Sequence, residues 1–333
     1  MSLLNALPGA VAQGLIWGIM AIGLYITYKV LDFADLTVDG SICTGAAVCA
    51  VLVVNGVNVW VAMLVALLSG ALAGLITGVF HTFMGIPAIL SGILTQLLLW
   101  SVNLKILGKS NLSLSSRVYG VIITQLSTGV AIAVVAAFVA VLIAVLYWFF
   151  GTERGCSIRA TGNNPHMSRA QGINTSLNKI IGLMISNAIV ALSGALLAQY
   201  QGFADINMGR GAIVIGLAAV IIGEALISRI SRNFAVTLLG VALGGVVYYL
   251  VYQFVIWLGL DTELLKMFSA LIVAVFLAVP YWKKRYFSGG KGKKSDKNGG
   301  TGAAANQSLA GGTDSETSGD GAVSDGGEVE NNA

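Results

Sequence analysis

The stretch GTERGCSIRATGNNPHMSRAQGINTSLNK, residues 151–179, is a polar island between two apolar segments. The segment before it, residues 121–150, is about thirty residues long, and the one after it covers residues 180–200. The island carries four basic residues and one acid, namely Arg154, Arg159, Arg169, Lys179 and Glu153. Because basic loops between membrane spans stay in the cytoplasm, this pattern predicts a structured cytoplasmic segment in the middle of a membrane protein.

The composition of the whole chain agrees with a membrane protein. Of the 333 residues, 56% are hydrophobic and only 10% are charged, whereas soluble domains carry about 25% charged residues. Helices that cross a bilayer need about 20 apolar residues, and the chain offers many such runs in series. A β-barrel would show short alternating segments instead. The sequence therefore predicts an all-α polytopic membrane protein.

The apolar runs predict about nine transmembrane helices. In chain order they cover residues 8–28, 36–54, 59–80, 87–107, 121–150, 180–200, 212–227, 234–258 and 264–281. The basic pair Arg229 and Arg232 belongs inside, and the acidic pair Asp261 and Glu263 fits outside. Strict alternation then places the N-terminus outside and the C-terminus in the cytoplasm. Three basic residues near the predicted outer face run against this bias: Lys105, Lys109 and Arg117.

Two stretches of the chain resemble each other. Phe33–Gly40 reads FADLTVDG and Phe203–Gly211 reads FADINMGRG, and each leads into a span rich in small residues. In the predicted topology they lie on opposite sides of the membrane. This arrangement is typical of an inverted repeat, here four spans, a fifth span with the central island, and four spans again.

The polar residues of these two stretches are candidates for the translocation path. They are Asp35, Thr37, Asp39, Asp205 and Asn207, with Arg210 close by. Ionisable residues close to the hydrocarbon region are costly and mark a path or a pairing. The alternative is that these residues cap helices, because Asp is a good N-cap residue and anions favour helix N-termini. Within the seventh span, Glu224 is expected to pair with Arg229 or Arg232.

No catalytic or metal-binding constellation is recognisable. The two histidines, His81 and His166, have no carboxylate at ligand spacing, and Cys43, Cys49 and Cys156 lack the spacing of a metal site. Motifs of hydrolases and metalloproteases are missing from the sequence. We therefore expect neither enzymatic activity nor a cofactor, and no metal site.

The last part of the chain changes composition at the end of the predicted transmembrane domain, residues 1–283. Residues 284–333 are rich in Gly, Ser, Asn and Asp, with no aromatic residue after Phe287. Such a segment cannot bury a core, which predicts a disordered cytoplasmic tail.

The island resembles the coupling loop of ABC importer permeases of the branched-chain amino-acid and ribose type. The residues that carry the resemblance are Arg154-Gly-Cys-Ser-Ile-Arg159-Ala-Thr-Gly162-Asn-Asn-Pro165 and Ala170-Gln-Gly172-Ile-Asn174. It extends over nearly all of residues 8–283, including Ala191–Ala195 and the turn Asp35–Gly40. The turn after the first predicted span has the sequence Asp32-Phe-Ala-Asp35, which differs from the usual sequence of the family at this place. This difference leaves the exact solute class open.

The resemblance implies the membrane subunit of an ATP-driven importer in a bacterial inner membrane, carrying a small polar solute, in first place an amino acid. It also implies a second permease copy, a separate ABC ATPase subunit and an extracytoplasmic solute-binding protein, with no nucleic-acid partner. The candidate ATPase-coupling residues are Arg154, Ser157, Ile158, Arg159, Ala160, Thr161, Gly162, Asn163, Asn164, Pro165, Ala170 and Gly172. Here Ser157–Thr161 is expected to form one helical turn, ended by Gly162 and Pro165, and Asn164 to begin the next helix.

Two other functions compete with this interpretation. An ion- or proton-coupled secondary transporter needs acids in the middle of its spans, whereas the acids of this chain cluster at span ends. Such a transporter also leaves the basic island unexplained. An intramembrane enzyme is disfavoured because no catalytic set is recognisable.

Overall fold

The computed structural model describes residues 3–115, 118–227 and 233–257, with single helical positions at 267, 271, 274 and 278. The chain divides into a unit of Met1–Ser288 and a second unit, Gly289–Ala333. This second unit lies outside the described residues, as do the loop with Arg229 and Arg232 and most of the predicted last span.

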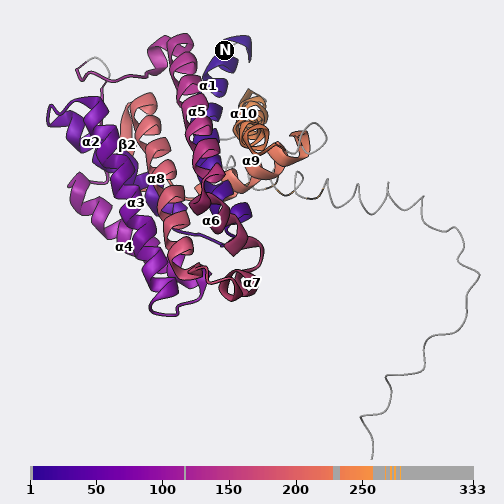
Figure 1. Cartoon of the computed structure of the whole chain (residues 1–333). Helices are drawn as coiled ribbons and strands as arrows, with labels where there is room; N and C mark the ends of the chain where they lie inside the picture. The colour runs from indigo at the N-terminus through magenta and orange to yellow at the C-terminus, as the bar shows by residue number, and fades with distance from the viewer. Residues whose placement is uncertain are drawn as a thin grey trace, which may run out of the picture. The chain divides into compact units, whose positions relative to one another are not determined.

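Helices make up most of the described chain (Figure 1). In order, the elements are α1 (Leu3–Tyr25), the π-helix η1 (Ile26–Val30), α2 (Val38–Val54), α3 (Val59–Thr82), α4 (Ala88–Leu107), β1 (Asn111–Ser113), the 3-10 helix η2 (Gln125–Ser127), α5 (Thr128–Gly151), α6 (Glu153–Asn163), α7 (Pro165–Ala170), α8 (Thr175–Gln201), β2 (Phe203–Asp205), α9 (Ala212–Ile227) and α10 (Phe234–Trp257).

These elements confirm the all-helical, polytopic class. Within the described residues, six helical segments are long and apolar enough to cross a membrane: Ala6–Val30, Val59–Thr82, Ala88–Leu107, Gln125–Gly151, Thr175–Gln201 and Phe234–Trp257. The apolar helices α2 and α9 are shorter, with 17 and 16 residues. The prediction of nine spans therefore stays a prediction.

The centre of the bundle is α8, which packs against α1, α2 and α3. Small residues permit this packing. A Cβ atom at Gly45 of α2 would collide with the carbonyl group of Ala191, and one at Gly74 of α3 would collide with that of Leu183. Because the glycines leave these positions open, the helix backbones approach more closely than larger side chains would allow.

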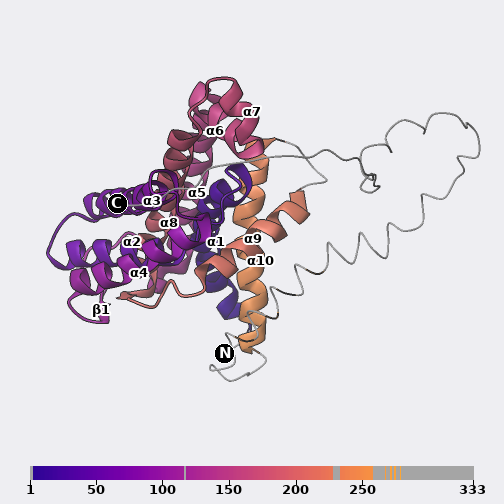
Figure 2. The same cartoon turned by 90° about the horizontal axis from the view of Figure 1, so that it is seen from below.

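Contacts between distant segments define two ends of the bundle. At one end, which we call the α6 end, Lys179 Nζ lies 3.1 Å from His81 Nε2 and Gly162 packs against Val30. At the opposite end, the β end, β1 and β2 pair antiparallel with Leu112 opposite Ala204. Figure 2 shows α6 and α7 at one end and β1 away from them.

Both short helices follow a break in the chain. After α1, the π-helical bonding of η1 continues until Leu31, whose N–H donates to the Ile26 carbonyl at 3.0 Å. Asp32 then takes a φ of 52°, a value that is uncommon outside glycine. After α8, Gly202 ends the helix with a φ of 78°. The chain turns back at both places before α2 and α9 begin.

Candidate functional site

The N-termini of α2 and α9 meet at Asp39. Its carboxylate accepts hydrogen bonds from the backbone N–H groups of Gly211 at 3.0 Å and Ile213 at 2.9 Å. First-turn N–H groups have no partner inside their own helix and favour a negative charge. One acid of α2 therefore caps α9 from a different part of the chain.

The turn before α9 reinforces this junction. Gly209 passes so close to α2 that a Cβ atom there would collide with the carbonyl oxygen of Asp39. The N–H of Gly209 donates to Cys43 Sγ at 3.1 Å, and that thiol donates to the carbonyl of Ile206 at 3.4 Å. The two short helices are thus held together by backbone and side-chain contacts.

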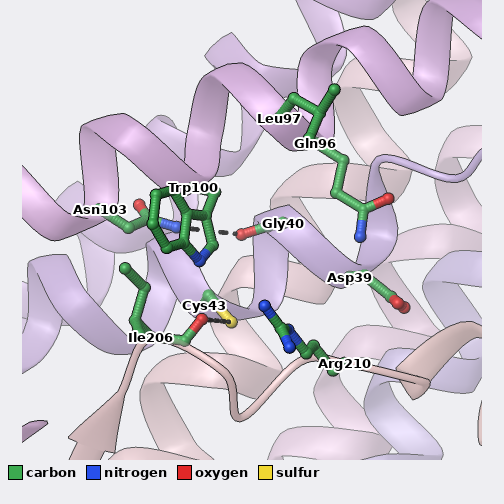
Figure 3. A pocket seen from close by; sticks show the side chains of 9 residues that line it. All are labelled: Asp39, Gly40, Cys43, Gln96, Leu97, Trp100, Asn103, Ile206 and Arg210. Atoms are coloured by element: carbon green, nitrogen blue, oxygen red, sulfur yellow. Dashed lines mark hydrogen bonds between the residues drawn. The ribbon is translucent and has the colours of Figure 1, made fainter. Parts of the chain in front are cut away.

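A pocket of about 310 Å³ opens beside this junction (Figure 3). Its lining comes from α2, α4 and the turn before α9: Asp39, Gly40, Cys43, Gln96, Leu97, Trp100, Asn103, Ile206 and Arg210. In Figure 3 the guanidinium of Arg210 and the amide of Gln96 extend toward the space between Trp100 and Asp39. The pocket combines opposite charges, two amides and an indole ring.

Several polar groups of this pocket have hydrogen-bonding capacity to spare. Asn103, with 1% of its surface exposed, donates from Nδ2 to the Gly40 carbonyl at 3.5 Å, and its Oδ1 atom has no partner. Among the described residues, the side chains of Gln96 and Arg210 also form no hydrogen bond or ion pair. Gln96 is half-buried and Arg210 is exposed, so the buried atom without a partner is Asn103 Oδ1. Because buried polar atoms are nearly always partnered in native proteins, this atom makes the pocket suited to a polar ligand.

Asp35 and Thr37 lie in a separate, buried network. The Asp35 carboxylate accepts from the Thr37 N–H at 2.9 Å and from Asn187 Nδ2 of α8 at 2.7 Å. The Thr37 hydroxyl lies 2.7 Å from that of Thr77 on α3, and Thr77 donates to Thr95 of α4 at 2.9 Å. These contacts fasten the chain reversal before α2 to three helices, which favours the packing role.

Asp205 and Asn207 do not line the pocket. They form a local turn near the β end, in which the Asn207 N–H donates to Asp205 Oδ1 at 2.7 Å. Of the five residues predicted for the path, the structure thus places only Asp39 at the pocket.

The α4 side of the pocket, formed by Gln96, Trp100 and Asn103, is not among the residues predicted from the sequence. A signal was present, because α4 has the lowest mean hydropathy of the six candidate spans. In addition, Ser91, Thr95 and Asn103 recur at multiples of four residues and are all buried. A polar stripe on one face of a span indicates a polar neighbour.

The central island folds into two helices, α6 and α7. Thr152 caps α6, accepting from the Gly155 N–H at 3.4 Å, and Asn164 caps α7, accepting from the Met167 N–H at 3.0 Å. Pro165 occupies the first turn of α7, where its missing N–H costs nothing. The predicted start of the second helix is confirmed. The predicted single turn Ser157–Thr161 is wrong, because it lies within an α6 of 11 residues.

The two faces of α6 have different surroundings. On the bundle side, Asn178 of α8 donates to Ser157 at 2.7 Å and to Thr161 at 2.9 Å. Arg159 stacks its guanidinium 4.1 Å from the Phe234 ring centre and 5.4 Å from that of Phe150. Ile158 is fully buried.

Gly162 also faces the bundle, against Val30 at the end of η1. Six candidate coupling residues are exposed instead: Arg154, Ala160, Asn163, Asn164, Ala170 and Gly172. Pro165 is half-buried. The island therefore presents one side to the bundle and keeps the other free.

An ion pair joins α9 to the same region. Glu224 Oε2 lies 2.9 Å from Lys29 Nζ of η1. Lys29 is not a partner predicted from the sequence, and the predicted partners Arg229 and Arg232 lie outside the described residues. Among the described residues no group of His, Cys, Asp or Glu is arranged to hold a metal ion.

Comparison with known proteins identifies the family. Residues 7–280 match the family model described as branched-chain amino acid transport system / permease component. A tyrosine transport system permease protein from Clostridioides difficile is 40% identical over 83% of this chain and 91% of its own. A fructose import permease protein, FruF, from Bifidobacterium longum is 26% identical over 72% of this chain and 68% of its own.

The fold has a counterpart among solved structures. PsaBC from Streptococcus pneumoniae, solved in complex with Fab, superposes with a TM-score of 0.50 at 16% identity, over 86% of this chain and 95% of that one. At this identity the likeness concerns the fold alone. The family match, which covers most of the chain, decides the class: the protein belongs to the permease components of branched-chain amino-acid transport systems, which are membrane subunits of ABC importers.

Proposed function

We propose that this permease imports an amino acid across a bacterial inner membrane and receives the work of ATP hydrolysis through α6 and α7. The coupling role is supported by the observation that one face of α6 packs against the bundle while the other face is exposed. Its inner face is held by α8, Phe150 and Phe234, while Ala160 on its outer face is exposed. A rigid helix held in this way transmits a displacement at its outer face to the bundle.

The solute class is supported by the relatives. The tyrosine permease is the more similar of the two at 40% identity, against 26% for the fructose permease. This difference favours an amino acid over a sugar.

The mode of action of the family indicates which proteins this permease works with. Membership implies a separate ATPase subunit and a solute-binding protein. We place the ATPase at the α6 end, where the basic island lies, and the solute-binding protein at the β end. A second copy of this chain completes the path.

The orientation and the repeat belong to the same proposal. The N-terminus lies outside and the C-terminus inside, as the basic residues of the later loops favour. The two breaks before α2 and α9 lie toward opposite ends, with Phe33 beside His81 and Phe203 in the strand pairing. Short helices that begin inside the bundle and meet at their N-termini are typical of inverted repeats.

Replacement of Ala160 by Trp tests the coupling role. Because Ala160 is exposed, the larger side chain leaves the permease fold unchanged but occupies the space of the docked ATPase. We expect normal membrane insertion and a normal elution profile, with co-purification of the ATPase and uptake in reconstituted vesicles each reduced at least about tenfold. The matched control is Ala160→Ser, which should retain both. Normal uptake by the Ala160→Trp protein would show that this face does not bind the ATPase.

A further inference from the structure

We propose that the pocket between α2, α4 and the turn before α9 binds an α-amino acid as a zwitterion. Arg210 holds its carboxylate, Asp39 receives its ammonium group, and Trp100 contacts its side chain. This inference rests on the proposed function, because it makes the pocket a binding site on the translocation path of the solute.

The two charges of the pocket are positioned by the same junction. Asp39 uses two acceptor positions for the N–H groups of Gly211 and Ile213, and an ionised carboxylate has about four such positions. The backbone of Arg210 is fixed between these contacts by its own N–H bond to the Asn207 carbonyl at 3.1 Å. The junction that joins α2 to α9 thus brings an anion and a cation to one pocket.

Arg210 is suited to a carboxylate. Its guanidinium forms no hydrogen bond or ion pair with any described residue, and it extends into the pocket (Figure 3). A guanidinium offers five donors in a planar fork that matches the two oxygens of a carboxylate. The amides of Gln96 and Asn103 supply further donors and acceptors on the α4 side.

The remaining wall of the pocket is apolar. It is formed by Trp100 and Leu97 of α4, a helix that is exposed along most of its length. An indole face packs well against another ring. The volume of about 310 Å³ lies at the small end of ligand pockets, roughly 300–1,000 Å³, and suits a free amino acid. An aromatic amino acid matches both the wall and the volume.

A sugar matches the pocket less well. Its hydroxyl groups are uncharged and point in all directions, so a bound sugar would desolvate Asp39 and Arg210 without supplying an opposite charge to either. A zwitterion supplies both charges at one end and leaves its side chain for the apolar wall.

The test uses protection of a cysteine placed at the pocket. The permease–ATPase complex carrying Leu97→Cys is reconstituted in lipid nanodiscs, and alkylation by N-ethylmaleimide is followed by peptide mass spectrometry. A cysteine introduced at exposed Asn55, in the loop between α2 and α3 and away from the proposed ATPase surface, is the internal reference. We expect L-tyrosine and L-phenylalanine to slow alkylation at position 97 at least about threefold without changing alkylation at position 55. Tyramine, which lacks the carboxylate, 3-(4-hydroxyphenyl)propionate, which lacks the ammonium group, and fructose should not protect.

Second substitutions, added to the Leu97→Cys protein, test the roles proposed for Arg210 and Trp100. Arg210→Gln should raise the half-protecting concentration of L-tyrosine at least about tenfold, and Arg210→Lys should raise it less. Trp100→Leu should remove the preference for L-tyrosine over L-leucine while protection itself remains. Protection by tyramine or fructose equal to that by L-tyrosine would overturn the zwitterion assignment.

The outcomes separate this inference from the proposed function. If no amino acid protects although the ATPase co-purifies and uptake proceeds, the pocket assignment is wrong and the importer function stands. If amino acids protect but Ala160→Trp leaves uptake normal, the coupling surface is wrong and the pocket stands.

Discussion

Replacement of Gly162 by Ala probes how tightly α6 is attached to the bundle. A methyl group at this position would collide with the carbonyl oxygen of Val30 and would lie 2.9 Å from the Cα atom of Leu31. Both obstacles are backbone atoms at the end of η1, so no side-chain rotation relieves the collision. Either α6 or the end of η1 must move.

The expected magnitude follows from the cost of overpacking. Extra volume in a packed site costs about 1–3 kcal/mol, and the better helix propensity of Ala returns up to about 1 kcal/mol. Because both obstacles are backbone atoms, we take the upper part of the overpacking range, about 2–3 kcal/mol, which leaves a net loss of about 1–2 kcal/mol. This loss corresponds to a fall in melting temperature of about 2–8 °C, taking about 2–4 °C per kcal/mol. The uptake rate should fall by more than the lost stability alone explains, because the displaced α6 is the proposed link to the ATPase.

The assay is thermal unfolding of the purified permease in detergent, followed by uptake in vesicles. Gly151→Ala is the matched control, because nothing lies within 4 Å of the added methyl group there. Its melting temperature should be equal to that of the parent protein or slightly higher. A Gly162→Ala protein that melts at or above the parent temperature would refute the close packing of α6 on η1.

Two further predictions concern the same end of the molecule. Arg159→Leu should destabilise the permease by about 0.5–2 kcal/mol, the range of a cation–π contact, because its guanidinium lies 4.1 Å from the Phe234 ring centre. In a double-mutant cycle with Phe234→Leu the losses should be less than additive; strict additivity would contradict the contact. The topology is checked at exposed Cys156: a membrane-impermeant maleimide should label it in inside-out vesicles and not in intact cells, and labelling from outside would reverse the proposed orientation.

Sequence alone determined the features that depend on local composition. Long apolar runs specify helices wherever they occur, so the membrane class and most helix bounds followed from hydropathy. The start of α7 followed from Asn164 and Pro165, whose side chains act on their own neighbours. The resemblance that identified the family lies in contiguous residues of the island and needed no tertiary contact.

Only the tertiary structure decided what the charged residues do. The sequence placed Asp39 near a helix start, but its hydrogen-bond partner Gly211 lies 172 residues away. Arg159, predicted as an ATPase-coupling residue, stacks on Phe234 of α10, a partner that the sequence did not indicate. Likewise, the partner found for Glu224 is Lys29. A side chain's partner is set by which helix faces pack together, and that packing depends on small residues far apart in the chain. The pocket could not be predicted from the sequence, because its walls come from three separated segments that meet only in the folded bundle.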